Sequence, residues 1–490
     1  MTDVLGPRLV VAGTHSGTGK TTVATGLMAA LRAAGATVAA AKVGPDFIDP
    51  GYHEVATGRP GRNLDVHCCG AAAVAALAAR AARGADVLVV EGVMGLFDGI
   101  GSTSESSTAH VAALLDAPVL LVVDGSSLGG SVAALVHGYD DTLVRTAGRR
   151  VAGVVLNRVG SDTHEAILRA ALERAGATVL GALRRDPALT WRDRHLGLVP
   201  VVEQRDAVAA SVRHLASVVA RSVDLAAVER VARAAPAVRP HPLPVTRLTG
   251  RVRVAVASGP AFGFAYPDNL ERLKEAGAEL VPFDPLHAPA LPAGAAALYA
   301  GGGFPEVFAA DLAANTPLLA DVRRAVARGL VTWAECGGML WLCRSIGGQR
   351  LCGVLPAHGA MGDRLAVGYR RAEVRRDSPV AAAGAVLRGH EHRYSTVTPP
   401  GDAMVLTGTS GTAAGGWATP TLLASYLHLH LGADPGPAER FVATAAPPSA
   451  AGPAASVKRP AATAAVPSAA GPAASAPATR PPGRESAPVV

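Results

Sequence analysis

Short apolar runs alternate with alanine-rich stretches through the first half of the chain. Each run ends at a Gly, Asp or Asn turn, and the runs are 8–13, 37–44, 86–92, 118–125 and 151–159. Strands that alternate with helices predict a parallel, doubly wound sheet. Ligands of such sheets bind at the carboxyl ends of the strands. Residues 1–232 are therefore predicted to form one α/β domain whose site lies at these turns.

A proline-rich segment separates this half from a second alternation. Residues 233–250 contain several prolines and no periodicity, which is typical of a linker. A second α/β domain is predicted over residues 251–435. Residues 436–490 are almost wholly Ala, Pro, Ser, Gly and Thr. Because such a composition buries too little apolar surface to offset chain entropy, we predict a disordered tail there.

Composition narrows the class of protein. Hydrophobic residues make up 49% of the 490 residues and charged residues 17%, which is a globular composition. The net charge is +7, but the arginines are scattered, so we predict small anionic ligands and no nucleic acid. No run approaches the ~18 apolar residues of a membrane span, and the N-terminus lacks signal-peptide features, so we predict a cytoplasmic protein without membrane contact. Five cysteines do not suggest a disulfide framework.

A glycine-rich loop after the first run predicts a phosphate site. Backbone N–H groups of such a loop wrap phosphate oxygens, a lysine neutralises them and a hydroxyl can bind Mg²⁺. The usual first glycine position holds Thr14, and Gly13 lies one residue earlier, so the loop is one residue longer than usual and resembles that of dethiobiotin synthetase. The predicted ATP-binding residues are Gly13, Thr14, Gly17, Thr18, Gly19, Lys20, Thr21 and Thr22.

Carboxylates and a second lysine follow neighbouring strands. Glu91 ends an apolar run and, with Thr21, is predicted to hold Mg²⁺. Lys42, Asp46 and Asp49 occupy a Pro/Gly-shaped loop, where they are predicted to contact the substrate, with Asp46 also a metal candidate. The alternative for this loop is a turn with capping aspartates.

Cys336 lies between an apolar run and a predicted helix. A strand-to-helix turn exposes a nucleophile at a helix N-terminus, which lowers a thiol pKa. Gly302 and Gly303 follow another strand, and their N–H groups are predicted to stabilise an oxyanion. The candidate bases are His390, His392, His428 and His430. A buried structural cysteine is the alternative, but the surrounding pattern favours a nucleophile.

Together these motifs resemble the cobyrinic and hydrogenobyrinic acid a,c-diamide synthase family of cobalamin biosynthesis. The resemblance spans about residues 8–432 and rests on these segments: GTHSGTGKTT, KVGPDFIDPGYH, ATGRPGRNLD, EGVMGLFDG, RHLGLVP, GGGFPE, AECGGM and SYLHLHL. It implies an α/β fold in which a P-loop NTPase domain like dethiobiotin synthetase precedes a class I glutamine amidotransferase-like domain. The implied reaction amidates the a and c acetate carboxylates of a corrin acid, through acyl phosphates, with ammonia from glutamine.

The resemblance also implies residue roles. Cys336 matches the nucleophile and His428 its base, while His430 stands where many related glutaminases have an orienting Glu. Asn157 and Arg158 match a nucleotide-contacting segment. The loop His390–Arg393 departs from the family pattern by a shift of its second histidine, which favours His428 as the base.

Several alternatives stay open. The acceptor is hydrogenobyrinic or cobyrinic acid, or another tetrapyrrole such as nickel sirohydrochlorin, and the sequence does not show whether it contains cobalt. A more distant alternative is a partition or assembly ATPase with a degenerate second domain. The expected partners are the corrin acid, glutamine and ATP, with Mg²⁺ as cofactor. A homodimer is left open.

Overall fold

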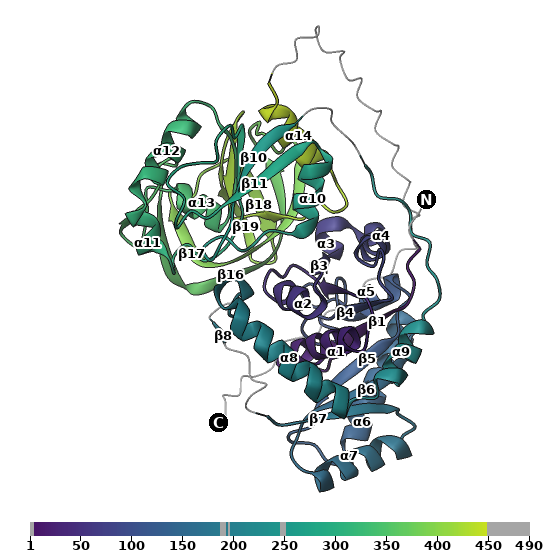
Figure 1. Cartoon of the computed structure of the whole chain (residues 1–490). Helices are drawn as coiled ribbons and strands as arrows, with labels where there is room; N and C mark the ends of the chain where they lie inside the picture. Colours follow the sequence, from purple (N-terminus) through teal and green to yellow (C-terminus); the bar gives the residue numbers. More distant parts are fainter. Residues whose placement is uncertain (1–3, 187–192, 195–196, 246–250, 448–490) are drawn as a thin grey trace, which may run out of the picture. The chain divides into compact units, whose positions relative to one another are not determined.

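The computed structural model describes residues 4–186, 193–194, 197–245 and 251–447. The first domain is built on a seven-stranded parallel sheet in the order β3-β2-β4-β1-β5-β6-β7 (Figure 1). Its strands are β1 (Arg8–Gly13), β2 (Val38–Val43), β3 (Arg62–Leu64), β4 (Val87–Glu91), β5 (Val119–Asp124), β6 (Val151–Val159) and β7 (Val179–Arg184). A two-residue pair, β8 (Asp193–Arg194) and β9 (Gly197–Leu198), stands apart from this sheet. The predicted parallel sheet is confirmed.

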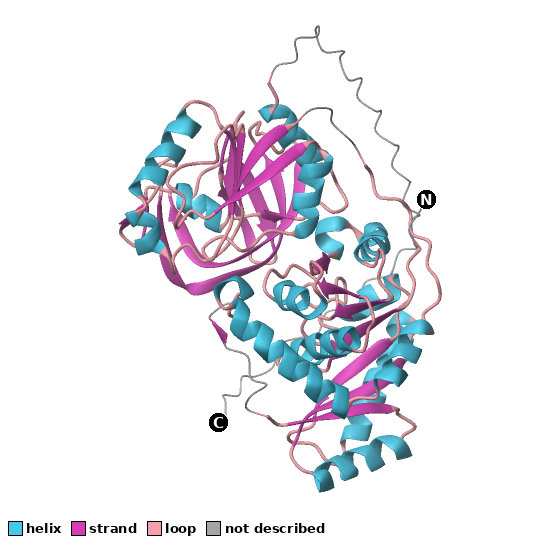
Figure 2. Ribbon diagram, in the orientation of Figure 1, coloured by secondary structure: helices cyan, strands magenta, loops and turns pink. Residues whose placement is uncertain are grey.

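Helices cover both faces of this sheet (Figure 2). Side chains of β1 alternate between two cores: Val10 and Ala12 belong to one, Leu9 and Val11 to the other. The helices are α1 (Lys20–Ala33), α2 (Asp49–Thr57), α3 (Val66–Cys69), α4 (Ala71–Ala81), α5 (Thr108–Leu114), α6 (Val132–Ala147), α7 (Asp162–Arg174), α8 (Arg205–Ser222) and α9 (Leu225–Arg233), with the 3₁₀ turn η2 (Val201–Glu203). Because both faces are buried, the strands are almost continuously apolar, as the sequence shows.

The strand order brings the predicted phosphate loop and Glu91 together. β1 lies between β4 and β5, and Val11 is in register with Glu91. The carboxyl end of β1 therefore adjoins the carboxyl ends of both neighbours. A ligand bound at the carboxyl end of β1 would therefore also contact residues at the ends of β4 and β5.

The second domain has a six-stranded central sheet in the order β11-β10-β12-β13-β21-β20, of which only β20 is antiparallel. The strands are β10 (Val252–Ala257), β11 (Ala278–Phe283), β12 (Ala297–Ala300), β13 (Val331–Glu335), β20 (Trp417–Thr419) and β21 (Leu422–Ser425). The helices are α10 (Pro267–Glu275), α11 (Ala309–Ala314), α12 (Thr316–Ala327), α13 (Gly337–Leu342) and α14 (Gly436–Ala445). This confirms the second α/β domain.

A second, largely antiparallel sheet lies in the same domain, and the pattern of the sequence does not predict it. Its strands are β14 (Ser345–Ile346), β15 (Gln349–Arg350), β16 (His358–Val374), β17 (Val386–Thr398), β18 (Met404–Gly408), β19 (Gly411–Gly415) and β22 (His428–Leu429). Much of β16 is exposed, so polar residues conceal its strand character. Only a few side chains, such as Val374 and Met404, reach the core shared with the central sheet.

The chain is still folded beyond residue 435, where the disordered tail is predicted to begin. Helix α14 starts at Gly436, Phe441 within it is fully buried, and its ring lies 5.8 Å from that of Trp333. The tail prediction is therefore wrong for residues 436–445, because two large apolar residues, Phe441 and Val442, anchor an otherwise alanine-rich segment. Residues 448–490 and the last part of the predicted linker, 246–250, lie outside the described residues.

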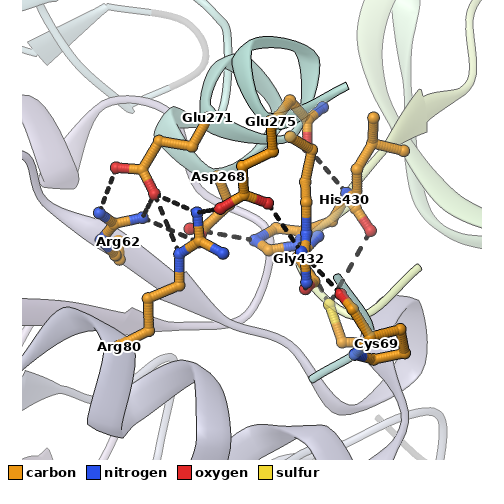
Figure 3. A network of polar contacts seen from close by, with 12 residues as sticks. Arg62, Cys69, Arg80, Asp268, Glu271, Glu275, His430 and Gly432 are labelled. Atoms are coloured by element: carbon orange, nitrogen blue, oxygen red, sulfur yellow. Dashed lines mark hydrogen bonds and ion pairs between the residues drawn. The ribbon is translucent and has the colours of Figure 1, made fainter. Parts of the chain in front are cut away.

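A charged network joins the two domains (Figure 3). Glu271 on α10 accepts hydrogen bonds from two arginines of the first domain: Arg62 Nη2 at 2.5 Å and Arg80 Nη2 at 2.6 Å. Arg62 also contacts Asp268, at 2.8 Å, and Arg80 contacts Glu275, also at 2.8 Å. Bidentate guanidinium–carboxylate pairs of this kind favour one orientation of their partners. Strand β3, which carries Arg62, and helix α4, which carries Arg80, thus face helix α10 of the second domain.

Candidate active sites

The glycine-rich loop has the backbone that a phosphate site requires. Gly17 and Gly19 adopt positive φ angles of 83° and 90°, a conformation that other residues rarely adopt. A Cβ at Gly13 would lie 2.4 Å from Thr18 Oγ1, so only glycine fits where β1 enters the loop. Lys20 starts α1, and its Nζ donates to His15 O at 3.1 Å. The lysine therefore folds back over the loop.

Other predicted nucleotide residues support the same loop. Asn157, at the end of β6, donates from Nδ2 to Thr18 O at 2.8 Å, and Tyr139 donates to Thr14 O. Arg158 lies next to Asn157 with a φ of 57° and binds Asp124 at 2.5 Å. Thr22 lies in the first turn of α1. The structure thus brings the predicted ATP-binding segments to one end of the sheet, with Arg158 paired to Asp124 at its edge.

Lys42 and Glu91 form the buried centre of the predicted acceptor site. Lys42 Nζ lies 2.8 Å from Glu91 Oε1 and 2.6 Å from Asp49 Oδ2. Thr21 Oγ1 donates to the same Glu91 oxygen at 2.6 Å. Although burial alone would act the other way, Lys42 and His53 hold the pKa of Glu91 well below its usual range. Glu91 is therefore a carboxylate shared by a lysine and the P-loop threonine.

Asp46 caps a turn, which was the alternative prediction for this loop. Its Oδ1 accepts from Ile48 N at 2.8 Å and Asp49 N at 3.0 Å, so it caps the turn that leads into α2. Asp49, by contrast, reaches Lys42 and lies 3.5 Å from Thr21 Oγ1. Of the two aspartates, Asp49 belongs to the charged cluster and Asp46 shapes the loop that presents it.

The charge balance of this cluster suits a divalent cation. Burial, followed by the nearby Asp46, raises the pKa of Asp49 well above its usual range. Asp49 and Glu91 both face Lys42, so a cation bound beside them would favour the ionised form of both carboxylates. No three His, Cys, Asp or Glu side chains within the described ranges could hold a metal by themselves. Thr21 Oγ1 and Glu91 Oε1, which lie 2.6 Å apart, are the oxygen atoms of this cluster that could hold a magnesium ion.

Cys336 occupies a strand-to-helix elbow, as predicted. It follows β13 with a φ of 46°, and its backbone N donates to Ser425 O at 2.7 Å. Helix α13 begins at the next residue. The predicted lowering of the thiol pKa is not found. Burial, with Glu306 nearby, raises the pKa of Cys336 to about 12. Desolvation therefore outweighs the effect of a six-residue helix.

The glycine loop and His428 converge on this elbow. Gly338 N donates to Gly301 O at 2.9 Å, and a Cβ on Gly337 would lie 2.9 Å from Gly303 N. A Cβ on Gly302 would lie 2.6 Å from His428 Cε1. The predicted oxyanion loop thus contacts both the residue after the nucleophile and the predicted base. Gly302 N, however, donates to Phe264 O at 2.9 Å, so the prediction that its N–H group binds the oxyanion is wrong and the role stays a prediction for Gly303. Burial, together with the nearby His392, lowers the pKa of His428 to about 3, so its ring is neutral at pH 7.

The four candidate histidines differ clearly in the groups that they contact. His390 on β17 pairs with His428 on β22, and their rings stack at 4.9 Å. His430 turns away: its Nδ1 lies 3.1 Å from Cys69 Sγ, and its Nε2 lies 4.0 Å from Asp268 (Figure 3). His392 pairs with Val367 on β16 and is only partly buried. The structure therefore places His428 beside the oxyanion loop, with His390 stacked on it, while His430 faces Cys69.

Sequence reasoning missed several residues of both sites. Glu335, just before the nucleophile, accepts from Leu429 N at 3.0 Å and from Tyr299 Oη at 3.0 Å, which fixes β22 beside β13. Burial raises the pKa of Glu335 to about 8. His53 binds Glu91 at 2.6 Å. The glutamate could have been noticed as a charge at the end of an apolar strand. His53 ends the segment KVGPDFIDPGYH, which was quoted for the resemblance, but it was given no role.

Two family models match the chain. The CobQ/CobB/MinD/ParA nucleotide binding domain covers residues 9–199, and the CobB/CobQ-like glutamine amidotransferase domain covers residues 253–436. The chain is therefore a glutamine amidotransferase fused to a nucleotide-binding domain. The second match removes the reason for the alternative of a partition ATPase with a degenerate second domain.

Curated relatives cover almost the same span. The hydrogenobyrinate a,c-diamide synthase of Thermobifida fusca is 49% identical over 89% of this chain and 96% of its own, and that of Streptomyces coelicolor is 46% identical over 89% and 97%. The cobyrinate a,c-diamide synthase of Synechococcus sp. is 41% identical over 89% and 97%. The chain belongs to the hydrogenobyrinate and cobyrinate a,c-diamide synthase family. The resemblance inferred from the motifs is confirmed. The chain is an amide-forming enzyme.

No helix within the described ranges combines the length and apolar character that crossing a membrane requires.

Proposed function

We propose that this enzyme uses ATP and glutamine to amidate the a and c acetate carboxylates of hydrogenobyrinic acid, with cobyrinic acid as the alternative acceptor. The observation that carries the proposal is that one chain holds two sites: a P-loop bonded to the Lys42–Asp49–Glu91 cluster, and a cysteine elbow whose neighbouring glycine loop contacts His428. Relatives named for hydrogenobyrinate at 46–49% identity, against 41% for cobyrinate, favour the acceptor without cobalt. We place the reaction in the cytoplasm, where ATP and glutamine are available.

The synthetase half of the reaction activates a carboxylate. A carboxylate is a poor electrophile, and transfer of the γ-phosphoryl group of ATP to its oxygen gives an acyl phosphate that ammonia can attack, with phosphate as the leaving group. Lys20 lies over the loop that would cradle the phosphates, and Lys42 adds positive charge beside Asp49. Thr21 and Glu91 would hold Mg²⁺, which neutralises phosphate charge when bound.

The glutaminase half supplies ammonia. The Cys336 thiol passes its proton to neutral His428 as the sulfur attacks the glutamine amide carbon, and the N–H group of Gly303 stabilises the oxyanion, because Gly302 N is already bonded to Phe264 O. The C–N bond then breaks, and ammonia leaves with the proton from His428. Water hydrolyses the resulting thioester to glutamate. Because burial raises the thiol pKa to about 12, proton transfer to His428 has to accompany the attack.

The division of labour can be tested with two variants. Purified protein is given ATP, Mg²⁺, and hydrogenobyrinic or cobyrinic acid, with glutamine or ammonium chloride as the nitrogen source, and product mass is followed. Cys336→Ala is expected to lose glutamine-dependent amidation, by about 10³-fold or more for loss of a nucleophile, and to keep the ammonia-dependent reaction. Lys20→Ala is expected to lose both, because carboxylate activation fails.

Two mass decreases of about one unit each, acid to amide, would establish diamidation. Glutamine hydrolysis without amidation of either corrin acid would contradict the proposed acceptor, and nickel sirohydrochlorin would be tested next. Equal loss of both nitrogen sources in Cys336→Ala would contradict the assigned nucleophile.

A further inference from the structure

The ring of Phe47 reaches from the acceptor loop of the first domain to the histidines of the second. Phe47 lies between Asp46, which shapes the loop, and Asp49, which contacts Lys42 at 2.6 Å. Its ring centroid is 5.0 Å from that of His428 and 5.6 Å from that of His390. It therefore touches the predicted glutaminase base from the synthetase side.

His428 lacks the usual means of orientation. In many related glutaminases a carboxylate two residues further along holds the catalytic histidine, but this position is His430, which faces Cys69. His428 Nδ1 is buried and has no hydrogen-bond partner among the described residues. A general base needs its ring held in position, a role that a hydrogen bond to its second nitrogen normally provides. Here ring packing has to replace that bond.

Three groups pack on the His428 ring. Gly302 lies against its Cε1 edge, His390 stacks at 4.9 Å with an interplanar angle of 16°, and Phe47 lies at 5.0 Å with an angle of 52°. His390 is itself held by Tyr266 Oη, 2.8 Å from its Nε2. Phe47 alone belongs to the other domain. Removing its ring would leave one side of the base unsupported.

The loop around Phe47 is rigidly tied to the synthetase site. Asn63 Nδ2 donates to Gly44 O at 2.9 Å and to Asp46 O at 2.8 Å. Beyond the loop, Phe47 also stacks on Phe264 at 5.4 Å, and these two rings line a hollow of about 220 Å³ next to α2 and η2. A change in the acceptor loop, or a ligand in this hollow, would therefore act on the ring that contacts His428.

We propose that Phe47 is a positioning residue for His428, which makes glutamine hydrolysis depend on the state of the acceptor loop. The inference rests on the proposed function and extends it. In the glutaminase half, Phe47 replaces the missing orienting carboxylate. In the synthetase half, it moves with Asp49 and its neighbours. The two half-reactions are thereby coupled through one side chain.

The test compares nitrogen sources in Phe47 variants. Phe47→Ala is expected to lower the glutamine-dependent kcat by about tenfold, because displacement of a reacting group by ~1 Å can cost up to ~100-fold. The ammonia-dependent rate is expected to fall much less than the glutamine-dependent rate, because the ion pairs and hydrogen bonds that hold the activating groups Lys42 and Glu91 do not involve the Phe47 ring. Phe47→Tyr keeps the ring and is expected to restore glutamine use.

Phe97→Leu is the matched control. Phe97 stacks on Tyr139 within the synthetase domain, at 5.5 Å, and Tyr139 supports the P-loop. Its loss is expected to affect both nitrogen sources alike. Glutamate release without ATP and corrin acid is measured in parallel. It should fall in Phe47→Ala, because the base is displaced, and stay unchanged in Phe97→Leu, because this ring lies in the synthetase domain.

Two outcomes would overturn the proposal. Equal loss of glutamine- and ammonia-dependent amidation in Phe47→Ala would assign Phe47 to acceptor binding alone. Unchanged glutamine use would show that His390 and Gly302 suffice to hold His428. The Cys336→Ala variant separates both outcomes from a failure of the proposed function, because it tests glutamine use without altering Phe47.

Discussion

Lys20 has a lower pKa than lysine usually has. Burial, together with the nearby Lys42, lowers its pKa from 10.5 to about 8. The bound phosphates of ATP would reverse this effect, because opposite charges favour the protonated ammonium. Protonation of Lys20 and ATP binding are therefore linked, and each should strengthen the other.

This linkage predicts how ATP affinity depends on pH. Below pH 7 Lys20 is charged in the free enzyme, so binding takes up no proton there. As the pH rises through about 8 the free enzyme loses this charge, so ATP binding should weaken and be accompanied by proton uptake. Calorimetric titrations with Mg-ATP at pH 6.5 and 9, in buffers of different ionisation enthalpy, measure the uptake directly. An ATP affinity unchanged between these pH values, with no uptake at pH 9, would contradict the assignment.

At the scale of elements, each site is built from a strand that ends in a loop. β1 leads into the phosphate loop and β13 into the Cys336 elbow. In both cases a backbone conformation with positive φ, at Gly19 and at Cys336, turns the chain sharply into a helix. Such turns expose N–H groups and side chains at the carboxyl edge of a parallel sheet. The two halves of the enzyme thus reuse one arrangement for different chemistry.

Helix α14 is expected to be part of the folded second domain. Phe441 is fully buried and packs against Trp333 on β13, the strand that carries Cys336. Phe441→Ala should lower the free energy of unfolding by about 3–5 kcal/mol, as for other buried phenylalanines. Urea unfolding followed by tryptophan fluorescence checks this. Thr444→Ala, on the exposed side of the same helix, is the control and should stay within about 0.5 kcal/mol. Equal midpoints for both variants would show that α14 contributes nothing to the core.

At the scale of the whole molecule, two kinds of contact join the domains. The ring of Phe47 contacts aromatic and histidine rings, and Glu271 binds Arg62 and Arg80 (Figure 3). The apolar contact lies beside the reacting groups, whereas the charged network lies on α10. The charged network is therefore suited to hold the relative orientation of the two domains on which the contact between Phe47 and His428 depends.

Neutralising Glu271 should weaken the domain contact. Glu271→Gln removes the charge shared by two arginines and is expected to lower the stability by about 1–2 kcal/mol, since charged hydrogen bonds contribute ~1.5–3 kcal/mol and this carboxylate is partly solvated. Scanning calorimetry in 0.1 M and 1 M salt measures the effect, and high salt should reduce it by screening. Glu279→Gln, an exposed carboxylate of the same domain, is the control. A loss that does not respond to salt would argue against an electrostatic contact.

Much of the fold and part of the candidate sites could be predicted because their signals are local. Apolar runs that end in polar turns marked the strands, and the sequence from Gly13 to Thr22 contained the whole phosphate loop. The Cys336 elbow was equally readable, since strand, nucleophile and glycines are consecutive. Helix α14 and the long strand β16 could not be predicted in this way. Each contains only a few buried residues in a segment of mostly small or polar residues, so its average hydrophobicity does not indicate a folded element.

The sequence by itself determined which residue types each site contains and which backbone turns present them, because these depend on neighbours along the chain. Only the tertiary structure decided which histidine meets the oxyanion loop, that Asp49 and not Asp46 joins Lys42, and that Phe47 lies on His428. These pairings depend on strand register and domain contact between residues up to hundreds of positions apart. Burial likewise raised the pKa of Cys336 although its local motif favours a lower one, because desolvation is a property of the folded molecule.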